Sequence, residues 1–121
     1  MSPFLFTDAI LHDRPIKVFN HGNMLRDFTY IDDIAEGVIR CIDRVAEPDP
    51  AWNAECPDLF NYSAPTEIYT IGNSEPVRLM DFIAAIEAAC GKEAVKEYLP
   101  MQPGDVYQTN ADTSALQRDM G

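Results

Sequence analysis

The sequence is short of basic residues relative to acidic ones. Nine lysines and arginines stand against twenty aspartates and glutamates, which gives a formal net charge of −11. A chain with this charge repels phosphate backbones and anionic lipid surfaces, so we expect neither a nucleic acid nor a membrane as a partner. Any anionic ligand must therefore be held by local donors that act against the overall field.

Histidines and glycines are too few and too scattered to predict a metal site or a phosphate-binding loop. The two histidines, His12 and His21, have no second type of ligand at a metal-binding spacing, so no metal is expected. No G-x-x-G-x-x-G or G-x-x-x-x-G-K-[ST] pattern is present, and neither is a Ser/His/Asp set or a nucleophile elbow. From the residues alone, the chain has no recognisable catalytic apparatus and no cofactor loop.

Cysteines are also few, and long apolar runs are absent. The three cysteines, Cys41, Cys56 and Cys90, form no C-x-x-C pair, and no secretory segment is recognised at the start of the sequence. The longest apolar runs are far too short to span a bilayer. These features predict a reducing, cytoplasmic setting.

The chain has enough apolar sequence to fold. Its 121 residues are 46% hydrophobic, which fits one small globular domain. Periodicity predicts a mixed α/β fold in which helices alternate with short strands. The helices are expected at 4–12, from Asp32 or Asp33 to about 46, at 79–90 and from 113 to 120, and the strands at 16–19, 26–31, 67–73 and 95–100.

Capping residues predict where two of these helices begin or end. Asp33 and Glu36 have the spacing of a capping box at the start of the second helix, and Gly91 is expected to cap the end of the third. Residues 47–66 contain four prolines and no clear period, so we expect a long surface loop there.

Arg26 is the residue whose chemistry leaves two readings open. Its guanidinium offers five fixed donors that fit a phosphate, and it follows a turn that contains Gly22. However, Asp27, Asp32 and Asp33 lie close in the sequence, and the residues alone favour a local ion-pair network. The two neighbouring aspartates could be a catalytic pair, but their position favours helix capping.

The motifs in their order resemble a known family. The run "IKVFNHGNMLRDFTYIDDIAEGVIRCID", then "YTIGNSEPVRLMDFIAAIEAACG" and "LPMQPGDVYQTNADTSAL", is similar to the C-terminal, substrate-binding portion of NAD-dependent epimerases/dehydratases, the extended short-chain dehydrogenases. The phrases "NHGNMLRDFTYIDDI" and "LPMQPGDVYQTNAD" are most similar to those of UDP-glucuronate 4-epimerases of capsule and lipopolysaccharide synthesis. The resemblance covers essentially the whole sequence.

The resemblance implies substrate-binding roles for six positions. Arg26 falls where the family's arginine binds the diphosphate of a UDP-sugar, and Asp105 where an aspartate contacts the ribose hydroxyls. Gln102 falls where many relatives carry a second phosphate-binding arginine. The strand end that lines the family's uracil pocket corresponds to Val18, Phe19 and Asn20.

The resemblance also implies what the intact parent would contain. Members of the family bind NAD in a Rossmann domain and use a Tyr-x-x-x-Lys pair, and neither the NAD loop nor that pair is found in these 121 residues. We therefore expect a partial substrate-binding domain over residues 1–121, with the Rossmann domain missing and no NAD bound. The activity implied for the parent is that of an isomerase in polysaccharide biosynthesis.

Several expectations follow for the chain on its own. UDP-sugar binding should be weak or absent, because one wall of the pocket would be lost. The apolar faces of the first helix and of the strands, left without the missing domain, should be exposed and should favour a homo-oligomer. The alternatives are the same portion of a dTDP-glucose dehydratase or a UDP-sugar decarboxylase, and a stand-alone, non-enzymatic interaction module.

Overall fold

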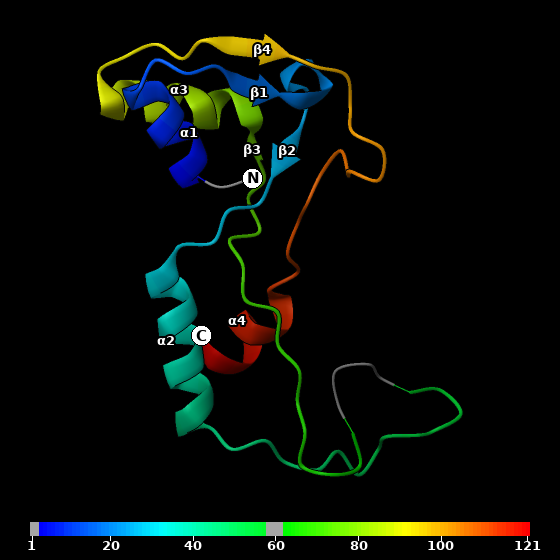
Figure 1. Ribbon diagram of the computed structural model, residues 1–121. Coiled ribbons are helices and arrows are strands. Elements are labelled where there is room, and N and C mark those ends of the chain that lie inside the picture. The colour runs from blue at the N-terminus through cyan, green and yellow to red at the C-terminus, as the bar shows by residue number, and fades with distance from the viewer. Residues whose placement is uncertain (1–2, 58–61) are drawn as a thin grey trace. The chain divides into compact units, whose positions relative to one another are not determined.

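The computed structural model describes residues 3–57 and 62–121, which fold into two compact units. One unit comprises the chain up to Asp27 together with Glu75–Thr109, and the other comprises Phe28–Ser74 and Asn110–Gly121. Helices and short strands are both present (Figure 1), so the predicted mixed α/β class is confirmed. The expectation that residues 1–121 form one partial domain stays a prediction.

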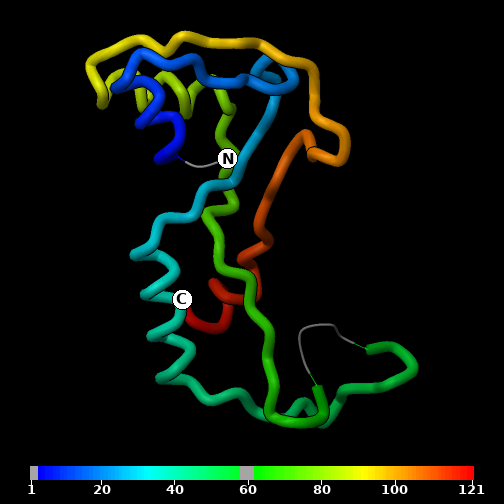
Figure 2. The backbone as a smooth tube through the Cα atoms, in the orientation of Figure 1, coloured from blue at the N-terminus to red at the C-terminus, as the bar shows by residue number. Residues whose placement is uncertain are grey.

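The first unit contains two small pairs of strands. Strands β1 and β4 are parallel, with Ile16 opposite Lys96, and they lie side by side in Figure 2. Strands β2 and β3 are antiparallel, with Arg26 opposite Val77. The elements of this unit are α1 (Pro3–Leu11), β1 (Ile16–Val18), the 3₁₀ turn η1 (Phe19–Gly22), β2 (Leu25–Arg26), β3 (Val77–Arg78), α3 (Leu79–Cys90) and β4 (Lys96–Tyr98).

Helices α1 and α3 form the core of the first unit with strand β1. Both helices lie on the same side of the β1–β4 pair (Figure 1). Each places two buried apolar side chains one turn apart, Phe6 with Ile10 and Leu79 with Ile83, as the helical period requires. The buried apolar residues are Phe6, Ile10, Ile16, Val18, Met24, Leu79 and Ile83. The predicted helices at 4–12 and 79–90 are confirmed.

The second unit is built on helices α2 (Ile31–Asp43) and α4 (Ser114–Met120), which contact each other. Gly37 is the buried residue of α2, and a Cβ built there would lie 2.9 Å from Ile71 Cδ1. Glycine at this position therefore lets the chain around Ile71 approach the helix closely. The described residues between 47 and 66 form no helix or strand, and they run away from α2 and α4 in Figure 2.

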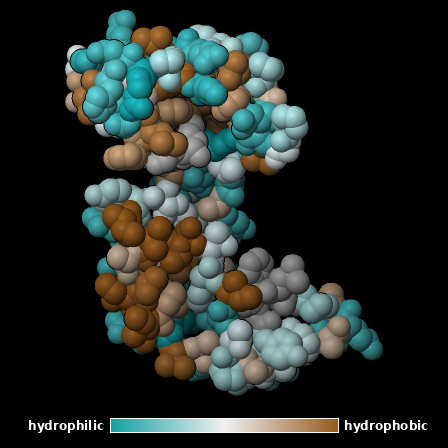
Figure 3. Space-filling model, viewed as in Figure 1, coloured by the Kyte–Doolittle hydropathy of each residue, from teal (hydrophilic) through white to brown (hydrophobic). Residues whose placement is uncertain are grey.

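Helix α2 carries an exposed apolar stripe, which we call the α2 apolar face. Figure 3 shows hydrophobic surface gathered over this helix. Ile42 and Val45 are 73% and 81% exposed, far above the values of a core residue. The face consists of Ile31, Ile34, Val38 and Ile42 of the helix, and Val45 lies just beyond the end of the helix at Asp43. The sequence predicted an uncovered apolar patch on the first helix and the strands, where Phe4 and Leu5 of α1 are exposed, but it did not predict the face on α2.

Two of the predicted strands are wrong. Only Arg26 of the segment 26–31 lies in a strand, because β2 pairs with just two residues of β3 and Ile31 already belongs to α2. Within the described residues, 67–73 forms no extended strand, and Ile68 is 55% exposed. Both segments are rich in β-branched and aromatic residues, but a strand also needs a hydrogen-bonding neighbour along its length.

The predicted capping box at Asp33 and Glu36 is also wrong. Helix α2 begins two residues earlier, with Tyr30 at the N-cap position and no side-chain capping bond. Asp33 lies in the first turn, where a carboxylate still interacts favourably with the helix dipole. Glu36 accepts a hydrogen bond from Arg40 Nε at 2.7 Å instead, one turn further along.

Candidate functional site

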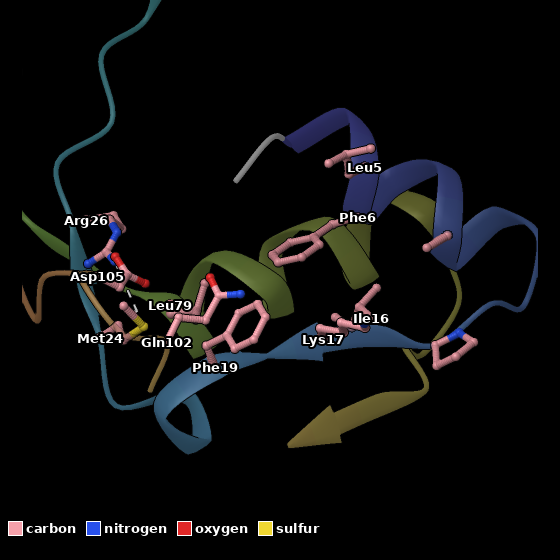
Figure 4. Close-up of a pocket in the computed structure, with 12 residues that line it drawn as sticks. Leu5, Phe6, Ile16, Lys17, Phe19, Met24, Arg26, Leu79, Gln102 and Asp105 are labelled. Carbon is pink, nitrogen blue, oxygen red and sulfur yellow. Dashed lines mark hydrogen bonds and ion pairs between the residues drawn. The ribbon is translucent and has the colours of Figure 1, made fainter. Parts of the chain in front are cut away.

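A pocket of about 450 Å³ lies within the first unit. It is mostly apolar, with a few polar groups at one end, which is typical of small-molecule sites. Helix α1, strand β1, the start of α3 and the turn at 102–105 all contribute to its wall (Figure 4). The lining residues are Leu5, Phe6, Ala9, Pro15, Ile16, Lys17, Phe19, Met24, Arg26, Leu79, Gln102 and Asp105.

Arg26 is held at the polar end of this pocket by a charged partner and two carbonyls. Its Nη2 donates to Asp105 Oδ1 at 3.0 Å, and its Nη1 donates to the carbonyl oxygens of Leu25 at 2.8 Å and Tyr107 at 3.2 Å. The Arg26 side chain is only 16% exposed. The ion-pair reading of this arginine is correct in kind, but the partner lies 79 residues further along the chain and not among the neighbouring aspartates.

Asp105 reaches Arg26 because a tight turn precedes it. The N–H of Asp105 donates to the carbonyl of Gln102 at 3.1 Å, and Gly104 takes the positive φ of 82° that favours glycine. Beyond the turn, Leu25 N–H donates to Tyr107 O at 3.0 Å, which ties the segment after Asp105 to β2. The turn at 102–105 is thus the element that brings Asp105 and Gln102 to the pocket.

Four of the six predicted site residues meet at this pocket. Phe19, Arg26, Gln102 and Asp105 all line it, although they come from segments about eighty residues apart. Figure 4 shows the Phe19 ring and the Gln102 amide near Leu79, with Arg26 and Asp105 pointing toward each other beside Met24. This convergence is the main observation in favour of a ligand site.

Val18 and Asn20 are not among the residues that line the pocket. The Val18 side chain is fully buried in the core, with 0% exposed, and its carbonyl accepts from Leu99 N–H at 2.9 Å. Asn20 adopts a positive φ of 49° in η1, and its Nδ2 donates to the carbonyl of Asn23 at 2.7 Å. The two residues shape the turn that follows β1, next to Phe19.

Sequence reasoning missed three contributors to the pocket. The carbonyl of Tyr107 accepts a hydrogen bond from Arg26. Met24 and Lys17 line the pocket, and Lys17 is a second cation in its wall. A carbonyl contact leaves no mark on the side-chain pattern, so no signal could have found Tyr107. Lys17 alternates with buried Ile16 and Val18 along β1, and this pattern did indicate a side chain that does not enter the core.

A tyrosine in the second unit has a strongly perturbed titration. Tyr69 donates from its hydroxyl to Glu67 and to Asp119, and burial together with these acidic partners raises the pKa of Tyr69 above its usual range. The Asp119 carboxyl has a lowered pKa, chiefly because Arg118 donates to it. Tyr69 therefore keeps its proton near neutral pH, and its environment is that of a tethered structural hydroxyl.

Other kinds of site find no support in the described part of the chain. Residues 3–57 and 62–121 contain no group of three or more His, Cys, Asp or Glu side chains that could hold a metal ion. Among the same residues, no helix is both long and apolar enough to cross a membrane.

Comparison with known proteins gives one consistent family. Residues 3–54 match the NAD dependent epimerase/dehydratase family. The chain is 50% identical over 120 residues to Protein CapI of Staphylococcus aureus, a match that covers 99% of the chain and 36% of that protein. It is 39% identical over 119 residues to the probable UDP-glucuronate 4-epimerase of Rhizobium meliloti, which covers 97% of the chain and 35% of the relative.

The fold matches a solved structure over nearly its whole length. UDP-glucuronic acid 4-epimerase from Bacillus cereus, in complex with UDP-glucuronic acid and NAD, superposes with a TM-score of 0.75 at 28% identity, covering 99% of this chain and 33% of that one. The chain thus spans about a third of the length of the proteins that it matches. These matches show that the chain resembles a portion of proteins of the NAD dependent epimerase/dehydratase family.

Proposed function

We propose that this chain forms the UDP-sugar-binding part of a nucleotide-sugar epimerase of the UDP-glucuronate 4-epimerase type. The observation that carries the proposal is the convergence of Phe19, Arg26, Gln102 and Asp105 on one pocket of about 450 Å³. The solved relative from Bacillus cereus contains UDP-glucuronic acid, and its likeness to this chain supports the same class of ligand.

Each of the four residues has a chemical role in the proposal. Arg26 supplies the fixed positive charge that a diphosphate needs, in a chain whose net charge otherwise repels anions. Phe19 offers an apolar surface to the uracil ring, and Asp105 accepts from the ribose hydroxyls. Gln102 offers an uncharged amide near the diphosphate. The turn that contains Asn20, together with the end of β1 at Val18, shapes the uracil side.

The activity of the intact parent is part of the same proposal. Inversion of the sugar at C4 needs NAD and the family's Tyr-x-x-x-Lys pair. We propose that residues outside these 121 bind the NAD and contain the pair. The present residues do not fit NAD themselves, because the sequence has no glycine-rich phosphate loop. The parent would then be a cytoplasmic isomerase that serves polysaccharide biosynthesis, and this chain would contribute binding without catalysis.

Two alternative functions predict different binding of nucleotide-sugars. The same portion of a dTDP-glucose dehydratase or a UDP-sugar decarboxylase would prefer another nucleotide-sugar, and affinities for UDP-glucuronate and dTDP-glucose separate these cases. A stand-alone interaction module would bind neither sugar, and the exposed α2 apolar face favours this reading. The reading frame that precedes the codon for Met1 also discriminates, because a parent enzyme requires a glycine-rich loop and a Tyr-x-x-x-Lys pair there.

A nuclear magnetic resonance titration of the ¹⁵N-labelled chain with UDP tests the proposed site. We expect chemical-shift changes to centre on Phe19, Arg26, Gln102 and Asp105, with affinity in the millimolar range or weaker, because the pocket lacks the wall that the rest of the parent would supply. Inorganic pyrophosphate at the same concentration is the control for attraction by charge alone. Shift changes confined to residues outside the pocket would contradict the proposal.

A further inference from the structure

Four of the five N–H groups of Arg26 already have a partner within the protein, the fourth through a weak contact from Nη2 to Met24 Sδ. Two donate from Nη1 to backbone carbonyls, and one donates from Nη2 to Asp105 Oδ1 at 3.0 Å. Nη2 also lies 3.9 Å from Met24 Sδ. The guanidinium is thereby fixed on one side, while its Nε–H makes no hydrogen bond within residues 3–57 and 62–121.

Asp105 is itself fixed before any ligand binds. Its Oδ1 accepts from Arg26 and from the N–H of Val106 at 2.8 Å, and the turn closed by its own N–H holds its backbone. Its Oδ2 makes no hydrogen bond to any described residue. The carboxylate thus uses one oxygen to hold the arginine and leaves the other available to a ligand hydroxyl.

The pair is buried enough for this contact to matter. The side chains of Arg26 and Asp105 are 16% and 31% exposed, so their attraction is less screened than that of a surface pair. An arginine that lost its charged partner here would keep two carbonyl contacts but no compensating charge, and a partly buried unpaired charge is unfavourable. It would then gain by turning toward solvent.

We propose that Asp105 is a positioning residue, which fixes the Arg26 guanidinium in the pocket before the diphosphate arrives. This inference rests on the proposed function and goes beyond a ribose contact for Asp105. A side chain that is already ordered loses less freedom when its ligand binds, so the positioning should raise affinity for the diphosphate more than for the nucleoside. Asp105 would therefore act on the phosphate end of the ligand through Arg26.

The positioning can be measured without any ligand. In the free chain, the heteronuclear NOE of Arg26 Nε–Hε should show a rigid side chain in the wild type and a clearly more mobile one in Asp105→Asn and Asp105→Ala. Asp13→Asn is the matched control, because it removes the same charge and an exposed ion pair with Lys92 at 3.0 Å in the same unit. An Arg26 signal that is equally rigid in the Asp105 variants would overturn the proposal, provided that both variants keep the wild-type spectrum elsewhere.

Affinities for two ligands then separate the positioning role from the ribose contact. If Asp105 positions Arg26, Asp105→Ala should weaken UDP roughly tenfold, which is about 1.4 kcal/mol. Uridine should be weakened much less, because it has no diphosphate for Arg26 to bind. Equal weakening of UDP and uridine would show a ribose contact alone and would overturn the positioning role. UDP binding that is unchanged in Arg26→Ala would reject the proposed function instead, and the ligand-free measurement would still decide whether Asp105 orders the arginine.

Discussion

Glu87 and Lys96 form an ion pair that joins helix α3 to strand β4. Their side chains are 18% and 21% exposed, and Glu87 Oε1 also accepts from the N–H of Ala94 at 2.7 Å. The hydrogen bond from Lys96, followed by that from Ala94, lowers the pKa of the Glu87 carboxyl. A carboxyl whose pKa is lower in the folded state stabilises the fold above its unfolded pKa, and this stabilisation is lost as the pH falls through the folded pKa.

We therefore predict a pH-dependent cost for Glu87→Gln. Near pH 7 the variant should lose about 1–2 kcal/mol of unfolding free energy, because a partly buried charged hydrogen bond is removed. Near pH 2, as the Glu87 carboxyl takes up a proton in the folded state as well, the difference from the wild type should shrink. Urea unfolding at the two pH values measures it, with Asp13→Asn as the exposed-pair control. An equal difference at both pH values would contradict the account.

At the scale of single residues, sequence reasoning named four residues that line the pocket but not the contacts between them. The motif around Arg26 indicated an anion-binding arginine, and the phrase that contains Asp105 indicated a second site residue. Their direct ion pair depends on a turn that folds back on β2 from 79 residues away, and no local pattern records such a contact. The aspartates close to Arg26 in the sequence suggested a local ion-pair network instead, because only neighbouring residues can be seen in a local pattern.

At the scale of elements, two glycines with positive φ allow the cost of backbone strain to be measured apart from the cost of side-chain crowding. Gly91 ends α3 with a φ of 66°, and a Cβ there would meet no atom within 4 Å. Gly22 ends η1 with a φ of 82°, and a Cβ there would lie 2.5 Å from Met80 Sδ. Alanine is strained at both positions, but it is crowded only at Gly22.

Gly91→Ala should cost about 1 kcal/mol of unfolding free energy, which is the usual cost of a left-handed alanine. Gly22→Ala should cost more, because the Met80 side chain must also move. Thermal and urea unfolding of both variants measure the difference, and Met80→Ala in the Gly22→Ala background should recover part of the excess. An equal cost for the two glycine substitutions would contradict this prediction, because it would show that the Met80 side chain moves aside without loss of stability.

Elements with strong local signals were predictable, and elements that need a distant neighbour were not. Helix α3 has apolar side chains at helical spacing and a glycine at its end, and both were read correctly from the sequence. The segments 26–31 and 67–73 are rich in β-branched and aromatic residues, but the extent of a strand depends on which partner strand is present. Helix α2 was found, although its start was misplaced because it uses no side-chain cap.

At the scale of the whole molecule, the α2 apolar face exposes several large apolar side chains to solvent. Val38 and Ile42 on this face are 47% and 73% exposed. Contiguous exposed apolar surface favours association, because burying it removes it from water. We expect the isolated chain to self-associate through this face as its concentration rises.

Analytical ultracentrifugation over a range of concentrations measures this association. The wild type should move toward dimers or larger species, and Val38→Glu should shift the association to at least tenfold higher concentration, since it places a charge in the face. Val95→Glu is the matched control, because Val95 is 56% exposed in the other unit. A wild-type chain that stays monomeric at all concentrations would contradict this expectation.

The central claim is that the pocket in the first unit binds the diphosphate of a UDP-sugar through Arg26. The most direct measurement is the dissociation constant of UDP for the wild type, Arg26→Ala and Arg14→Ala, from one set of titrations. Arg14 is an exposed arginine of the same unit that pairs with Asp8, so its loss controls for net charge. We predict that Arg26→Ala weakens UDP binding at least tenfold and that Arg14→Ala leaves it nearly unchanged. UDP binding that is unaffected by Arg26→Ala, or equally affected by both variants, would contradict the claim.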